Sequence, residues 1–239
     1  MWAGGKSMIR LAIQSIHESD SKICGHEVLA RKVMDGRPAA PGIFMAGAKP
    51  KDWFGLDMAV YLQVVEEPLL VNDPWPLFIN MSAPTFEYGA YFAQALHQVE
   101  KIVRLRKAPT VIEVSEDSAL SPAQLDLRLV DLRRIGAKIA MDDFGVSYSN
   151  IERLAAHEWD YCKIDLYSLR DASDLDWLID AKVQCDSRNI RIVLERFESQ
   201  DSRDLLQPFR KCMYQGYAFS RPRLISELAA QPPLSKVSG

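Results

Sequence analysis

The chain has 239 residues, which suits one large domain or two small ones. Its 48% hydrophobic and 26% charged residues are typical of a globular protein, and the net charge of -3 gives no basic surface for direct nucleic-acid or anionic-membrane binding. No apolar run approaches the roughly 18 residues of a membrane span. The four cysteines lack the spacing of a zinc site, so we expect reduced thiols in a cytoplasmic protein.

Short apolar runs recur along the chain with helical segments between them. The runs are mostly four to eight residues long and rich in Ile and Val, as expected of strands covered on both faces. The candidate strands are residues 9–16, 23–29, 77–81, 110–114, 137–141, 161–164, 190–194 and 213–219.

The segments between these runs show helical periodicity. Residues 122–135 have a wide apolar face and are followed by Gly136, where a helix often ends, and residues 174–188 and 199–211 lead into the next strands in the same way. Residues 35–57 contain several Pro and Gly, which predicts an irregular loop or lid. Eight strands separated by helices predict an α/β fold, a (β/α)8 TIM-like barrel that allows for one irregular or antiparallel strand. We expect one domain over residues 8–230, with flexible termini at 1–7 and 231–239.

Polar residues end, follow, lie in or begin seven successive candidate strands. They are Glu27, Asn80, Glu113, Asp142 with Asp143, Lys163, Glu195 and Gln215. A single acidic residue at such a place is more often a helix cap or a solvated loop residue, and Lys163 by itself could form an ordinary ion pair with Asp165. The series favours function, because all carboxyl ends of parallel barrel strands open on one face, where such enzymes build their sites.

Five carboxylates at one mouth repel each other unless cations neutralise them. Oxygen ligands favour Mg²⁺ or Mn²⁺, and two such ions can activate a water and stabilise an in-line displacement at phosphorus. The residues alone therefore indicate metal-assisted phosphodiester hydrolysis.

At these same positions the chain resembles the EAL-domain family of cyclic di-GMP phosphodiesterases. Residues 25–31 (GHEVLAR) resemble the signature motif in its EVL variant, and Asn80-Met81-Ser82 resembles its NxS strand end. The other matches are residues 113–116 (EVSE), 142–149 (DDFGVSYS), 163–165 (KID), 195–198 (ERFE) and 215–222 (QGYAFSRP). Seven motifs in the right order and spacing make this resemblance specific.

The resemblance implies two ions of Mg²⁺ or Mn²⁺. Glu27, Asn80, Glu113 and Asp142 would hold one, and Asp143 and Glu195 would help hold a second, with Asp142 between the two. It further implies that Lys163 positions the attacking water, that Glu195 assists proton removal and that Gln215 orients its neighbours.

Other residues would contact the substrate or the partner subunit. The residues implied at the cyclic di-GMP site are Leu29, Arg31, Asp165, Glu198, Tyr217 and Pro222. A loop containing Phe144, Gly145 and Ser149, braced by Glu116, would link metal binding to the contacts of a homodimer.

The expected activity is hydrolysis of cyclic di-GMP to linear pGpG in bacterial second-messenger signalling, under the control of a regulatory domain or partner protein. The alternative is a weakly active or inactive cyclic di-GMP receptor that regulates a partner protein or transcription. That alternative is motivated by Val28, by Arg196 and Phe197 after Glu195, and by Val146-Ser147 in the loop. A protein-interaction module without nucleotide is the third reading, and the retained carboxylates argue against it.

Overall fold

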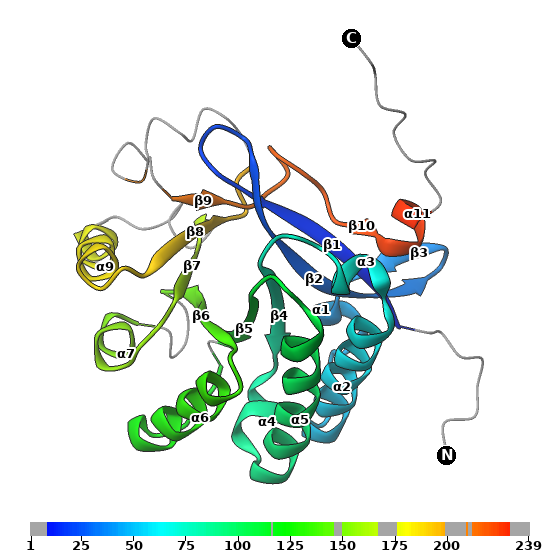
Figure 1. The fold of residues 1–239 in the computed structure, drawn as a ribbon, viewed down its shortest axis with the longest axis horizontal. Coiled ribbons are helices and arrows are strands. Elements are labelled where there is room, and N and C mark those ends of the chain that lie inside the picture. The colour runs from blue at the N-terminus through cyan, green and yellow to red at the C-terminus, as the bar shows by residue number, and fades with distance from the viewer. Residues whose placement is uncertain are drawn as a thin grey trace.

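Eight strands close into a barrel in the computed structural model, which describes residues 9–115, 117–145, 150–166, 176–198, 209 and 212–229. Neighbouring strands pair from β2 through β9, and pairing between β1 and β2 closes the ring (Figure 1). The barrel strands are β1 (Ile9–His17), β2 (Ile23–Met34), β4 (Leu77–Met81), β5 (Thr110–Val114), β6 (Lys138–Phe144), β7 (Tyr161–Asp165), β8 (Arg191–Glu195) and β9 (Met213–Tyr214). Two short strands, β3 (Arg37–Ala39) and β10 (Arg223–Leu224), extend the sheet beside β2 and β1.

One barrel strand runs against all the others. Strand β1 pairs antiparallel with both β2 and β9, whereas the pairs from β2 through β9 are parallel. A short turn, with a backbone hydrogen bond of 2.8 Å from Glu18 to Lys22, joins β1 to β2, as only antiparallel neighbours permit. The predicted α/β TIM-like barrel with one antiparallel strand is confirmed.

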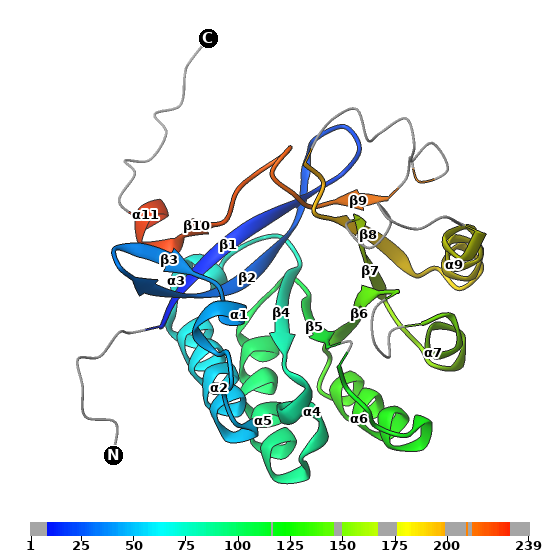
Figure 2. The same cartoon turned by 180° about the vertical axis from the view of Figure 1, so that it is seen from behind.

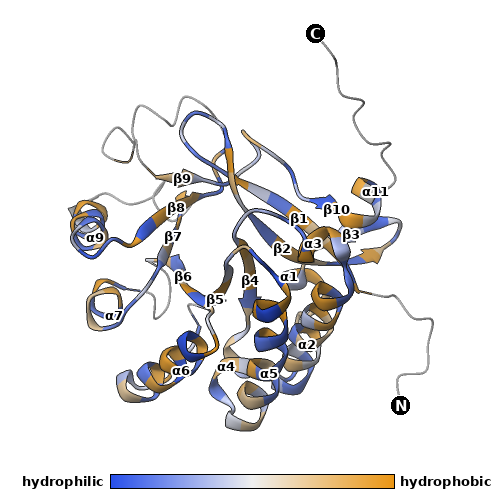
Figure 3. Cartoon of the chain, in the orientation of Figure 1, coloured by the Kyte–Doolittle hydropathy of each residue, from blue (hydrophilic) through white to orange (hydrophobic). Residues whose placement is uncertain are grey.

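Helices surround the barrel on the outside, and Figures 1 and 2 show them in sequence order around the strands. The longer ones are α2 (Pro50–Glu66), α5 (Gly89–Leu105), α6 (Pro122–Arg134) and α9 (Asp176–Ser187). Shorter helices are α1 (Pro41–Phe44), α3 (Pro68–Val71), α4 (Ala83–Glu87), α7 (Ile151–Ala156) and α11 (Ile225–Ala229). Hydrophobic and hydrophilic positions alternate along the helices in Figure 3, as expected of helices with one face on the barrel. No helix among the described residues is both long and apolar enough to cross a membrane.

The interior of the barrel contains a layer of packed side chains, one from each of the eight strands. These residues are Ile16, Cys24, Phe78, Val111, Ala140, Tyr161, Val193 and Met213. A barrel filled in this way is a packed core and not a pore, and enzymes of this architecture bind their ligands at its carboxyl end. All four cysteines are buried and free.

The irregular loop expected over residues 35–57 is wrong in part. Helix α1 begins at Pro41 and helix α2 at Pro50, so two of the prolines taken as breakers occupy the first turn of a helix. Proline is favoured there because its fixed φ suits the helix and its missing N–H has no partner in the first turn.

The last strand is shorter than the expected 213–219, because the chain turns after Tyr214. The amides of Phe219 and Ser220 both donate to the Gly216 carbonyl, which closes this turn. The helix expected over residues 199–211 lies outside the described residues except for Phe209.

Candidate active site

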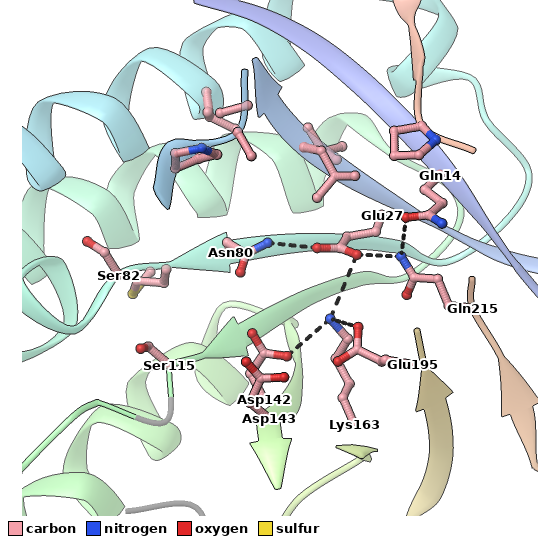
Figure 4. Close-up of a pocket in the computed structure, with 18 of the residues that line it drawn as sticks. Gln14, Glu27, Asn80, Ser82, Ser115, Asp142, Asp143, Lys163, Glu195 and Gln215 are labelled. Atoms are coloured by element: carbon pink, nitrogen blue, oxygen red, sulfur yellow. Dashed lines mark hydrogen bonds and ion pairs between the residues drawn. The ribbon is translucent and has the colours of Figure 1, made fainter. Parts of the chain in front are cut away.

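The polar residues at the mouth follow from the two-residue period of the strands. Successive side chains on a strand alternate between faces, so on β4 through β9 the residue two positions beyond the filled interior position also points inward. Phe78 is thus followed by Asn80 and Val111 by Glu113. The same step leads from Ala140 to Asp142, from Tyr161 to Lys163, from Val193 to Glu195 and from Met213 to Gln215. Figure 4 shows Asn80, Asp142, Lys163, Glu195 and Gln215 pointing toward one another from these strands.

Strand β1 contributes a residue that the sequence reasoning missed. Because β1 runs in the opposite direction, its inward residue at this level comes two positions before Ile16, and this residue is Gln14. Gln14 is buried, accepts a hydrogen bond of 3.3 Å from Gln215 Nε2 and donates one of 2.9 Å to the Ser220 carbonyl. The sequence feature that could have identified Gln14 is the antiparallel direction of β1, because on such a strand the inward residue at the mouth precedes the interior residue by two positions.

Lys163 is at the centre of the site and is 1% exposed. Its Nζ lies 2.5 Å from Glu113, 2.9 Å from Glu195, 3.1 Å from Asp142 and 3.8 Å from Glu27. The sequence left open an ion pair with Asp165, and the structure instead surrounds Lys163 with these four carboxylates.

The amides of two strands orient Glu27. Asn80 Nδ2 donates to Glu27 Oε1 at 3.0 Å, and Gln215 Nε2 donates to Oε2 at 2.5 Å. Figure 4 shows Glu27 between these two amides, above Lys163. Both carboxylate oxygens are therefore held in place before any ligand binds.

Burial and mutual repulsion change the protonation of these groups. Burial raises the pKa of Glu113 well above its usual value, and the neighbouring Glu27 raises it further, while Lys163 opposes this. Burial likewise raises the pKa of Glu195, with Asp142 adding to it. Burial would lower the pKa of Lys163, but Asp142, Glu113, Glu195 and Glu27 outweigh it and raise the pKa. One ammonium among four carboxylates leaves an excess of negative charge.

The excess charge and the donor set fit divalent cations that prefer oxygen ligands. Asp142, Asp143 and Glu195 each place a carboxylate oxygen within 4.8 Å of the others. Glu113 Oε2 is buried and accepts no hydrogen bond from the described residues. An orphaned carboxylate oxygen in such a cluster is a natural ligand for Mg²⁺ or Mn²⁺.

A bulge in β6 lets two consecutive residues reach one site. The pairing of β6 with β7 shifts register between Met141 and Phe144, and Asp143 has φ of +41°. Residues i and i+1 of a regular strand face opposite sides, and a bulge can re-aim one of them. Asp142 and Asp143 lie side by side in Figure 4 for this reason.

Helix α2, part of the segment predicted to be irregular, supports the end of β4. Asp57 is buried and accepts hydrogen bonds from Ser82 N at 2.9 Å and Ser82 Oγ at 2.6 Å. Tyr61, one turn later, donates to the Asn80 carbonyl at 3.1 Å. Burial raises the pKa of Asp57 to about 6, although the hydrogen bonds from Ser82 and Thr85 oppose it. Sequence reasoning missed this support because the partners are distant in the chain.

A cavity of about 820 Å³ opens above the cluster. Small-molecule sites are typically clefts of this order. Of the predicted substrate residues, Leu29, Arg31, Glu198, Tyr217 and Pro222 line it. Arg31 Nη1 donates to the Ala30 carbonyl at 2.8 Å, and the Arg221 guanidinium lies 4.3 Å from the centre of the Tyr217 ring.

The sixth predicted substrate residue, Asp165, is not among the residues that line the cavity. Asp165 is 5% exposed, and its Oδ2 lies 3.1 Å from Arg196 Nη1. Arg196 also lines the cavity and has φ of +53°.

The predicted loop residues divide into two groups. Phe144 is buried against Trp177 with ring centres 5.7 Å apart. Gly145 has φ of +99°, and a Cβ added to it would lie 3.1 Å from the Trp177 ring. Glu116 and Ser149 lie outside the described residues.

Known proteins share this fold and these sequence features. The model of the EAL domain family matches residues 6–222. A curated relative from Escherichia coli (strain K12), "Probable cyclic di-GMP phosphodiesterase PdeA", is 28% identical over 216 residues, which are 84% of this chain and 29% of that protein. The chain thus spans less than a third of that relative's length.

Two solved structures illustrate the fold similarity. Bacillus subtilis YkuI, solved "in complex with substrate c-di-GMP and calcium", has a TM-score of 0.75 and 24% identity over 90% of this chain and 55% of that one. Klebsiella pneumoniae BlrP1, a "manganese/cy-diGMP complex", has a TM-score of 0.73 and 23% identity over 94% of this chain and 58% of that one. Since the family model covers nearly the whole chain, this protein belongs to the EAL domain family.

Proposed function

We propose that this chain is a metal-dependent phosphodiesterase that hydrolyses cyclic di-GMP to linear pGpG. The observation that carries the proposal is the complete inward ring of carboxylates, amides and one lysine at the carboxyl end of the barrel. Its curated relatives include proteins named cyclic di-GMP phosphodiesterases, and the two related structures were solved with that nucleotide.

Two cations, Mg²⁺ or Mn²⁺, fit the excess negative charge at the mouth. We assign one to Glu27, Asn80, Glu113 and Asp142, and a second to Asp143 and Glu195, with Asp142 shared. When bound, such ions would make a water nucleophilic and stabilise charge on the phosphate.

The chain's own residues supply orientation and proton transfer. Lys163 is held by four carboxylates at the base of the cavity, where its ammonium can position a water. Glu195 borders the same space, 2.9 Å from Lys163 Nζ, and can accept the proton of that water. Gln215 fixes Glu27 through the 2.5 Å hydrogen bond.

The cavity walls would hold the dinucleotide. Arg31 offers a guanidinium for paired hydrogen bonds to phosphate oxygens, and Tyr217 offers an aromatic ring to a guanine. Leu29, Glu198 and Pro222 complete the wall, and Asp165 acts at the rim through its contact with Arg196.

A second candidate is a cyclic di-GMP receptor with little or no turnover. Arg196, with its left-handed backbone, directly follows a residue assigned to metal binding, and this favours the receptor as the alternative. A receptor would keep the binding site while its chemistry is impaired, and it would regulate a partner protein or transcription.

Incubation of the pure protein with cyclic di-GMP and Mg²⁺ or Mn²⁺ tests the proposal. We expect pGpG by chromatography and none from Glu27→Gln, whereas Glu18→Gln, at the exposed turn at the other end of the barrel, should remain active. Tight binding without turnover in Mn²⁺ would support the receptor. Absence of both binding and turnover would refute both candidates.

We further propose that the protein forms a homodimer, and that the dimer contacts are connected to the metal site through the loop containing Phe144, Gly145 and Ser149, braced by Glu116. The protein would be cytoplasmic and controlled by a regulatory domain or a partner protein. Sedimentation measured with metal and cyclic di-GMP should give twice the monomer mass. A monomer under those conditions would rule out this coupling.

A further inference from the structure

The backbone at Arg196 is unusual, and the packing around it explains why. Phe197 is fully buried, with its amide donating to the Gln215 carbonyl at 3.0 Å and its carbonyl accepting from Ala218 at 3.0 Å. A Cβ on Gly216 would lie 2.2 Å from the Phe197 carbonyl oxygen, so the two chain segments touch. This contact fixes the chain after β8 and leaves Arg196 with φ of +53°.

An arginine in this conformation is strained. The left-handed region is disfavoured for any residue with a Cβ, and such strain concentrates at functional sites. Arg196 pairs with the buried carboxylate of Asp165, yet its side chain is still 56% exposed and lines the cavity, so it can also reach a ligand there. Glycine would remove the strain at this position.

The cationic side chains that line the cavity indicate a function for Arg196. Among the described residues that line the cavity, the cations are Arg31, Lys163 and Arg196. The ammonium of Lys163 is already paired with four carboxylates. The two arginines come from different walls, since β2 and β8 are separated by β9 and β1 in the sheet order.

We propose that Arg196 binds the phosphate of the cyclic dinucleotide that is cleaved, the one nearest Asp142, Asp143 and Glu195. This inference rests on the proposed ligand, which carries two phosphodiester anions. Arg196 directly follows Glu195, and Asp165, whose register partner is Glu195, holds its guanidinium at the rim. A guanidinium has five N–H donors in a planar fork, and this fork matches the oxygens of a phosphate. After cleavage the same contact would hold the terminal phosphate of the linear product.

Calorimetry with cyclic di-GMP tests this, with Ca²⁺ as the divalent ion because a related structure contains both together. We expect Arg196→Gln to weaken binding about tenfold and Arg196→Lys by less, because lysine keeps the charge without the fork. The control is Arg191→Gln, which makes the same charge change at the other end of β8 and should bind within about twofold of the wild type.

Inhibition by pGpG gives a second readout. If Arg196 holds the cleaved phosphate, Arg196→Gln should raise the inhibition constant of pGpG at least as much as it raises the dissociation constant of cyclic di-GMP. Arg196→Gly should fold with an unchanged or higher melting temperature, since glycine accepts the positive φ.

Wild-type affinity in Arg196→Gln would overturn the inference, because Arg196 would then have no part in ligand binding. Equal losses in Arg191→Gln and Arg196→Gln would also overturn it, because the effect would then come from overall charge. Either result leaves the proposed phosphodiesterase in place. A wild-type protein that does not bind cyclic di-GMP would overturn both.

Discussion

The substitution Glu113→Gln separates the effect of the carboxylate cluster on stability from its role in metal binding. Glu113 is 1% exposed. Among the described residues, no group donates to its Oε2, and the one cation paired with it is Lys163. The amide has almost the same shape, and its oxygen can still accept from Lys163. Each buried ion costs several kcal/mol of desolvation, and the one ammonium of Lys163 offsets this only in part for four carboxylates, so we expect the neutral amide to stabilise the metal-free protein by about 2 kcal/mol. At about 2–4 °C per kcal/mol for a chain of this size, the melting temperature should rise by roughly 4–8 °C.

Metal should cancel this advantage. A cation at about 100 times its dissociation constant stabilises the wild type by about 2.7 kcal/mol. If loss of this ligand lowers metal affinity about 100-fold, the variant gains only about 0.4 kcal/mol at the same concentration.

Thermal unfolding with chelator and then with Mn²⁺ measures both effects, and Glu18→Gln is the exposed control. A variant that melts below the wild type in chelator would refute the charge argument. A variant with the full wild-type response to Mn²⁺ would refute the assignment of Glu113 to a metal.

Other predictions concern the surrounding groups. Lys163→Ala leaves four carboxylates without their cation and should lower the free energy of unfolding of the metal-free protein by about 3–5 kcal/mol, measured in urea. In the metal-loaded form it should lower turnover far more than nucleotide binding. Equal losses in rate and affinity would contradict its role in the chemical step. Burial raises the pKa of Asp57 from 3.8 to about 6, so its contribution to stability is lost as pH rises between these values, by up to about 3 kcal/mol. The difference in unfolding free energy between wild type and Asp57→Asn should therefore change over this pH interval. A difference that does not depend on pH would contradict this prediction. Burial raises the pKa of Cys24 to about 11 and of Cys212 to about 12, so alkylation of native protein near neutral pH should be slow for both and fast after unfolding; rapid native labelling would show that they are accessible.

The sequence alone determined that the polar side chains of the site lie directly above the apolar layer in the barrel. Each strand alternates between its two faces, so the spacing of Phe78 from Asn80, or Tyr161 from Lys163, already placed a polar side chain above an apolar one. This information is local, because the two-residue period of a strand does not depend on what the strand packs against. The fold class and the converging carboxylates could therefore be predicted without coordinates.

The tertiary structure decided which of these residues meet. Lys163 could have paired with Asp165, two residues away, yet barrel closure surrounds it with four carboxylates and pairs Asp165 with Arg196. Gln14 joined the ring only because β1 runs antiparallel, and Asp57 became a support for β4 only because α2 packs beside it. Strand direction, closure and helix docking depend on contacts between distant parts of the chain, and no local pattern encodes them.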